Sequence, residues 1–362
     1  MKLVMDIINL NFLNLIFSKS KKMNTSNEIM PKARANGILI EYDKNKNEYL
    51  LIGGSDRTQG FNDFWLLLIS EKKWQKLSIP ELSNIFTPRI GVAYSVTENN
   101  DNSLSLFIHG GQDFFNQKFY SDMIHILIDK SNPEKSKAVN KIVLPLDISK
   151  NPCDRNSHCM VKDDDKEKIY IFGGGKKEQL LNDLWCYDYF LNKYELLNIK
   201  DLNNIIEPRE LFGMCYHNNE LIIFGGRLMD KIDRNSYIID LKNNFCRLGP
   251  KLPFPLCSFC FTKIKYENNY YIIIYGGTDG NIFSNNFVVY DFVKENFKKS
   301  KYIINKELVN NDPNLSVFLG RISSMMTYDE KNKKIILYGG SASDKEWDII
   351  NAVDVKDILN DL

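Results

Sequence analysis

Six short segments of the chain share one pattern, an apolar run that ends in a pair of glycines. The pairs are Gly53-Gly54, Gly110-Gly111, Gly173-Gly174, Gly225-Gly226, Gly276-Gly277 and Gly339-Gly340. Their first glycines are 57, 63, 52, 51 and 63 residues apart. A period of this size is typical of repeat architectures, in which each unit buries its apolar faces against its neighbours. We therefore expect one closed array of six similar units rather than several unrelated domains.

Each glycine pair is expected to end the second strand of a hairpin. In the first unit, apolar runs at residues 34–42 and 49–52 flank a polar turn at 43–47, and the other units repeat this order. Nine to eleven residues after each pair, a polar residue opens a third apolar run; these residues are Asp63, Asp122, Asp183, Asn235, Asn286 and Asn351. A fourth run begins at Trp74, Tyr194, Phe245 and Phe297 in four units, and an insertion at 129–140 precedes it in the second unit.

Four strands in each of six units is the composition of a β-propeller, and the units resemble kelch repeats. The resemblance rests on Pro-Arg before first strands (88–89 and 208–209), an aromatic before Gly-Gly, the segment 182–188, and an aromatic that closes the unit. It covers residues 31–362 and implies an all-β, six-bladed kelch-type β-propeller with four antiparallel strands per blade. Blade five departs from the pattern with Pro255-Leu256, and blades two and six lack the closing aromatic.

The sixth unit reaches residue 362 where its outer strand is due to begin, and an unpaired third strand would leave a sheet edge open. Residues 1–30 precede the propeller and carry a spare apolar run, so part of residues 11–17 is expected to supply the outer strand of blade six. A disordered tail, a signal peptide and translation from Met23 are the alternatives. Polar residues interrupt the run and 18–22 is a poor cleavage region, which disfavours secretion. The run is also too short and too polar to span a bilayer.

The charge and cysteine content narrow the class of partner and the compartment. Lys plus Arg total 47 and Asp plus Glu total 46, so the chain has no basic excess with which to bind nucleic acid or an anionic membrane. Seven cysteines are an odd number without the density of a disulfide scaffold, which favours the cytoplasm or the nucleus. Cys257 and Cys260 have metal-knuckle spacing, but a strand would turn them to opposite faces, so we expect buried thiols. Neither a metal nor a cofactor is expected.

Arginines and loop residues are expected to meet at one mouth of the propeller. In kelch-like blades the first strand begins and the second strand ends at the same face of the disc. The candidates for a binding face there are Arg34, Arg89, Arg155, Arg209, Arg227, Arg321, Phe114, Phe115 and Trp347. Arginine forks suit carboxylates or phosphates, which favours a ligand with acidic side chains or a free carboxylate. The alternatives are that the arginines pair with neighbouring Asp and Glu and hold loops together, and that the aromatics fold back over the blade.

Catalysis finds little support in the sequence. His109 takes the place of the aromatic before a glycine pair, His125 lies in a third strand, and His158 and His217 lie in first strands. Kelch-like propellers often serve as adaptors, and the resemblance implies a non-enzymatic module that binds a protein or peptide at the arginine-bearing face. The alternative is an enzyme, similar to a sialate epimerase, that acts on an acidic small molecule in the channel. A convergent acid–base pair among channel residues would distinguish the two.

Overall fold

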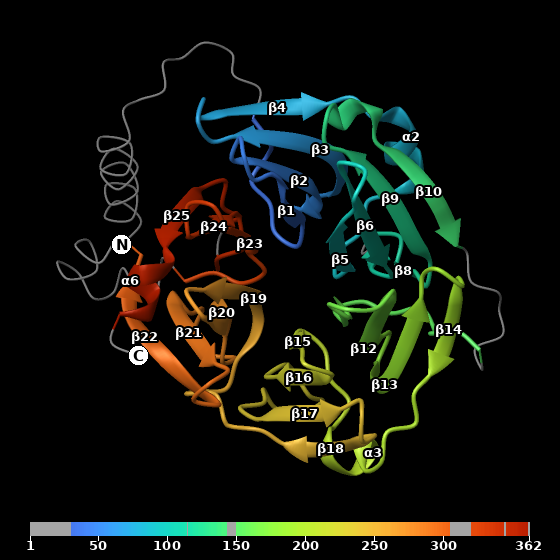
Figure 1. The fold of residues 1–362 in the computed structure, drawn as a ribbon, viewed down its shortest axis with the longest axis vertical. Helices are drawn as coiled ribbons and strands as arrows, with labels where there is room; N and C mark the ends of the chain where they lie inside the picture. The colour runs from blue at the N-terminus through green and yellow to red at the C-terminus, as the bar shows by residue number, and fades with distance from the viewer. Residues whose placement is uncertain (1–29, 114, 143–149, 305–319, 344, 361–362) are drawn as a thin grey trace. The chain divides into compact units, whose positions relative to one another are not determined.

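Residues 30–113, 115–142, 150–304, 320–343 and 345–360 are described in the computed structural model of the protein. The chain divides into two compact units, Met1–Met30 and Pro31–Leu362, and the described strands all belong to the second. They form five sheets of four strands and one of three, apart from a small two-stranded hairpin. The six sheets are arranged in a ring (Figure 1), which confirms the predicted six-bladed β-propeller.

The blades follow one another along the chain. Blade one is β1 (Ile38–Asp43), β2 (Glu48–Ser55), β3 (Gly60–Leu68) and β4 (Lys73–Leu77). Blade two is β5 (Ala93–Glu98), β6 (Ser103–His109), β9 (Met123–Asp129) and β10 (Lys137–Ile142), with β7 (Gln112–Asp113) and β8 (Lys118–Phe119) as the small hairpin. Blade three is β11 (Cys159–Lys162), β12 (Lys168–Lys176), β13 (Gln179–Asp188) and β14 (Lys193–Leu196).

The second half of the ring repeats this order. Blade four is β15 (Gly213–His217), β16 (Glu220–Phe224), β17 (Ser236–Asp240) and β18 (Phe245–Leu248). Blade five is β19 (Cys257–Tyr266), β20 (Asn269–Thr278), β21 (Asn286–Asp291) and β22 (Asn296–Ile303), and blade six is β23 (Met325–Asp329), β24 (Lys334–Tyr338) and β25 (Ile350–Asp354). Short helices lie in connections: α2 (Pro80–Ile85), η1 (Pro133–Lys135) and α3 (Leu202–Ile205).

Blade six has three strands within the described part of the chain. After β25 the chain forms α6 (Val355–Leu359), which buries Val355 and Ile358 and packs beside β22 of blade five. The Ser300 hydroxyl donates to the carbonyl of Ile358 at 2.6 Å and fixes this helix. The segment 11–17, predicted to supply the outer strand of blade six, lies outside the described residues, so that closure stays a prediction.

The described residues form six apolar clusters, one at each seam between neighbouring blades. Successive residues of a strand face opposite sides, so Ile38 and Ile40 pack against blade two whereas Leu39 packs against blade six. This two-sided burial explains why the sequence shows continuous apolar runs rather than alternation. The cluster between blades one and two has 17 buried residues, while the clusters between blades two and three and between six and one have nine each.

The glycine pairs are required by the backbone at the exit of each second strand. Gly173 and Gly174 have φ angles of 64° and 100°, in the left-handed region that favours glycine. A Cβ atom on Gly174 would lie 2.6 Å from the carbonyl oxygen of Asn156. The strand pairing shifts register between Phe172 and Gly174, so each pair turns the chain sharply into the following loop.

Candidate functional site

The loops that follow the glycine pairs and the starts of the inner strands share one face of the ring, which we call the loop face. The antiparallel register shows this, because Ile38 at the start of β1 lies opposite Ile52 at the end of β2. The opposite face, which we call the turn face, carries the turns between first and second strands and between third and fourth strands. Those candidate residues from the sequence that the structure describes belong to the loop face.

Five of the predicted arginines are buried within the loop face. Four of them are at most 1% exposed and the fifth, Arg321, is 4% exposed. Each guanidinium donates to the carbonyl of the first glycine of its pair: Arg34 to Gly53, Arg89 to Gly110, Arg155 to Gly173, Arg209 to Gly225 and Arg321 to Gly339. The arginines therefore clamp the backbone where the second strand exits.

Four of these clamps are completed by a carboxylate from the approach to the third strand. The ion pairs are Arg34–Asp63 at 2.6 Å, Arg89–Asp122 at 2.6 Å, Arg155–Asp183 at 2.7 Å and Arg209–Asp233 at 3.0 Å. Burial alone would raise the pKa of Asp183, but the hydrogen bonds and charge of Arg155 outweigh it and the pKa is lowered. A buried charge needs such a partner, since an uncompensated one is strongly destabilising.

These contacts correspond to the structural role that the sequence allowed as an alternative to ligand binding. The guanidinium groups hold each glycine pair to the third strand and are covered by the fold. Ligand binding at these arginines stays a prediction. Blade four takes its carboxylate from Asp233 rather than from the predicted opener Asn235.

Blades five and six depart from the clamp. In blade five Leu256 stands in the arginine position, and its carbonyl accepts from Gly226 N just as the Arg209 carbonyl accepts from Gly174 N. In blade six the third-strand residue is Asn351, whose Oδ1 accepts from Arg321 Nη2 at 2.8 Å.

Arg321 has no ion-pair partner among the residues that the structure describes, and its buried Nε also lacks a hydrogen-bond partner there. The ring of Trp347 lies 5.4 Å from its guanidinium carbon, a cation–π contact that partly compensates the charge. Trp347 is only 5% exposed, so this candidate aromatic folds back over the blade.

Other loop residues are exposed. Phe115 of the predicted set is 54% exposed, and the Arg227 side chain is 57% exposed while its Nε donates to Glu210 Oε1 at 2.8 Å. Phe114 lies outside the described residues. Sequence reasoning missed Met229 and Ile282, which are 75% and 51% exposed in the loops of blades four and five. The only sequence signal was that both are large apolar residues in loops after glycine pairs, and Leu228 and Phe283 beside them share it.

Comparison with known families agrees with this architecture. A family model described as the KLHDC2/KLHL20/DRC7 Kelch-repeats domain matches residues 136–311, which carry β10 and blades three to five. This match and the ring of six blades together support a kelch-repeat β-propeller. Kelch propellers are generally protein-interaction modules. A search of curated proteins finds no match to the chain.

A cavity of about 640 Å³ lies on the axis of the kelch ring, between the inner strands. At the loop face its rim is formed by equivalent residues with left-handed φ angles: Asn36, Gly91, Ser157, Leu211, Ser258 and Ser323. Backbone hydrogen bonds join neighbours along this rim, for example Ser157 N to Gly91 O at 2.7 Å. At the turn face the cavity is lined by Lys44, Glu98, Lys130, Lys162, Asp164 and Lys263.

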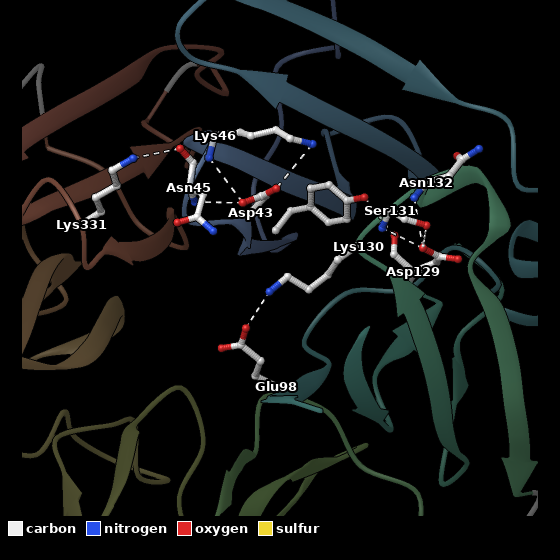
Figure 2. Close-up of polar contacts among 10 residues, drawn as sticks. Asp43, Asn45, Lys46, Glu98, Asp129, Lys130, Ser131, Asn132 and Lys331 are labelled. Carbon is white, nitrogen blue, oxygen red and sulfur yellow. Dashed lines mark hydrogen bonds and ion pairs between the residues drawn. The ribbon is translucent and has the colours of Figure 1, made fainter. Parts of the chain in front are cut away.

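Charged and polar groups on the turn face bridge the kelch blades, as Figure 2 shows for blades six, one and two. The Tyr42 hydroxyl of blade one donates to the Asp129 carbonyl of blade two at 2.9 Å, and Lys44 Nζ of blade one lies 3.6 Å from Glu98 Oε2 of blade two. Lys331 of blade six donates to a backbone carbonyl in the first turn of blade one at 2.9 Å. This part of the rim is therefore engaged in holding blades together.

The two cysteines with metal-knuckle spacing are buried in the kelch ring. Cys257 and Cys260 are buried free thiols, and burial raises the pKa of Cys260 to about 12. Among the described residues there is no group of three or more His, Cys, Asp or Glu side chains placed to hold a metal ion. No helix in the described ranges has both the length and the apolar character needed to cross a membrane.

Proposed function

We propose that this kelch propeller is a non-enzymatic adaptor that binds a protein or peptide through its loop face. The observation that carries the proposal is the exposure of Met229, in the same loop as Arg227, and of Ile282 in the loop of the next blade; we call these three residues the loop-face patch. Methionine and arginine are enriched at protein interfaces, and arginine is among the residues that dominate their binding energy. The buried arginines of the clamps leave this role to the exposed loop residues.

The loop-face patch spans two neighbouring blades. A Cβ atom on Gly280, two residues before Ile282, would lie 3.3 Å from Ile232 Cδ1, so the loops of blades four and five are in contact. Arg227 donates from both Nε and Nη2 to Glu210 Oε1, and its side chain remains 57% exposed. We infer a partner segment with an apolar side chain for the patch and a carboxylate that shares Arg227, since arginine binds carboxylates through two parallel hydrogen bonds.

The proposed class of partner rests on the net charge of the chain, and the proposed compartment rests on its free cysteines. A net charge of +1 gives no electrostatic footprint for nucleic acid, so we propose a protein partner. All seven cysteines are free thiols, which suits a reducing compartment such as the cytoplasm or the nucleus.

The test compares matched surface variants of the full chain as bait in native cell extract. Met229→Asp and Ile282→Asp place a charge in the loop-face patch. Phe190→Asp makes the same kind of change at a residue 77% exposed in a turn-face turn. We expect the patch variants to lose a partner that the unsubstituted chain and Phe190→Asp retain, with unchanged melting temperatures. A partner set that survives both patch variants would refute the assignment. Arg89→Ala and Arg209→Ala are unsuitable because these side chains are buried.

A further inference from the structure

Three of the four histidines lie at or beside the seam between blades two and three. His109 ends β6 and His158 precedes β11; their Nδ1 and Nε2 atoms are 2.9 Å apart across the seam. Both side chains are buried, with exposures of 0% and 5%. His125 stacks on Phe107, whose ring contacts Tyr189 of blade three. This seam thus gathers most of the histidines of the chain.

The histidine pair occupies a position that phenylalanines fill at the next two seams. The rings of His109 and His158 are 4.9 Å apart at 85°, and those of Phe172 and Phe212 are 5.6 Å apart at 83°. At the following seam the pair is Phe224 and Phe259, 5.6 Å apart. In all three the first residue precedes a glycine pair and the second lies near the start of the next inner strand. An apolar ring contact is therefore sufficient for packing at this position. Histidines in place of phenylalanines add groups that can bind a proton.

An added proton would have no counter-charge at the pair. The charged groups that face it are two complete ion pairs: Arg89–Asp122 from blade two and Arg155–Asp183 from blade three. The phenol of Tyr194 lies near the same groups. His109 Nε2 and His158 Nδ1 have no hydrogen-bond partner among the described residues.

Burial, and next the charge of Arg155, lowers the pKa of His109 to about 3; burial followed by His109 and Arg155 lowers the pKa of His158 as well. A buried charge without a partner is costly, so protonation favours exposure of the pair to water.

We propose that the seam between blades two and three is an acid-sensitive joint at which the ring opens first when the pH falls below about 6. The histidines stay neutral in the closed seam but bind a proton when the seam opens to water. The free energy that favours the closed seam is therefore at its full value above the ordinary histidine pKa of about 6.5 and declines as the pH falls. The seam also has one of the two smallest apolar clusters, with nine buried residues. Opening of one seam leaves the other five packed.

Hydrogen exchange at single-residue resolution tests this in the full chain, because three backbone hydrogen bonds between residues that the structure describes cross the seam. They run from Gly111 N to Arg155 O, from Arg155 N to Tyr120 O and from Ser157 N to Gly91 O. After correction for intrinsic exchange rates, we expect the opening constant of these amides to rise about tenfold from pH 7.5 to 5.5 for His109 alone. The matched amides of Gly277 and Ser323, which cross the seam between blades five and six where no histidine lies, should change far less.

The matched variant is His109→Phe with His158→Phe, which recreates the ring pair of the neighbouring seams. We expect it to fold and to lose the tenfold acid response at the crossing amides. An equal acid response at both seams of the unsubstituted protein would overturn the proposal, and that comparison needs no variant. A double phenylalanine variant that keeps the full response at Gly111 and Ser157 would overturn it too.

Discussion

The arginine clamp predicts that two reciprocal substitutions have opposite effects on stability. In blade three Asp183 accepts from Arg155 Nη1 and Nη2, each at 2.7 Å, and from Trp185 Nε1 at 2.6 Å. In blade six Asn351 stands in the same place opposite Arg321. Asp183→Asn converts the first site to the second, and Asn351→Asp does the reverse.

The geometry sets the size of each effect. In Asp183→Asn the Nδ2 group is a donor, so it cannot accept from Arg155 Nη2 or from Trp185 Nε1, and Arg155 loses its counter-charge. Breaking a buried pair costs about 3–5 kcal/mol; because the Asp183 side chain is 29% exposed, we expect the lower end, about 3 kcal/mol. Asn351→Asp supplies a charge-assisted bond to Arg321, which we expect to stabilise the protein by about 1–2 kcal/mol.

Thermal unfolding followed by circular dichroism measures both. For a propeller of residues 31–362, an unfolding entropy of about 2.1 cal/mol/K per residue gives a shift of about 1.4 °C per kcal/mol. We expect the melting temperature to fall about 4 °C in Asp183→Asn and to rise about 2 °C in Asn351→Asp. Glu195→Gln, which removes one exposed negative charge from β14, is the control and should change little. A fall below about 1 °C in Asp183→Asn, or a loss of stability in Asn351→Asp, would refute the clamp reasoning.

Two further predictions concern the first blade and the chain before it. A chain that starts at Met23 should melt below the full-length protein if residues 11–17 close blade six, and equal melting temperatures would exclude that role. Burial, followed by the charges of Asp329 and Glu330, raises the pKa of Glu41 to about 7. The pKa of Glu41 is higher in the folded protein than in the unfolded chain. The free energy of unfolding is therefore at its full value below about pH 4.5 and declines as the pH rises through 7. Glu41→Gln should therefore be stabilising by about 2 kcal/mol at pH 8 and neutral at pH 4 in urea unfolding, and a gain that is equal at both would contradict this.

The repeat was predictable because its determinants are local. Glycine is required wherever the backbone takes positive φ, as at Gly173 and Gly174, and a strand buried on both faces needs an unbroken apolar run. The outer strands were found for the same reason, since Trp74 and Tyr194 lie in β4 and β14 as expected. The glycine pairs and the apolar runs survive in each copy of the unit.

The roles of the arginines were less predictable because they depend on contacts between distant residues. Arg155 and Asp183 are 28 residues apart, and each recurs in the repeat, but recurrence does not show that two side chains meet. In blade four the carboxylate comes from Asp233, outside the counted pattern. The equivalence of His109–His158 with Phe172–Phe212 is visible only when the blades are placed side by side.

The clamp also bears on where binding specificity can reside in this propeller. An arginine that is fixed by a glycine carbonyl and an aspartate cannot be exchanged without a loss of stability, so it is poorly suited to select among partners. The exposed loop residues have no such constraint, since Met229 and Ile282 contribute little buried surface to the seams. The same fold can therefore keep its buried arginines while the loops after the glycine pairs change. For this reason, we expect substitutions at Met229 and Ile282 to alter binding without altering stability.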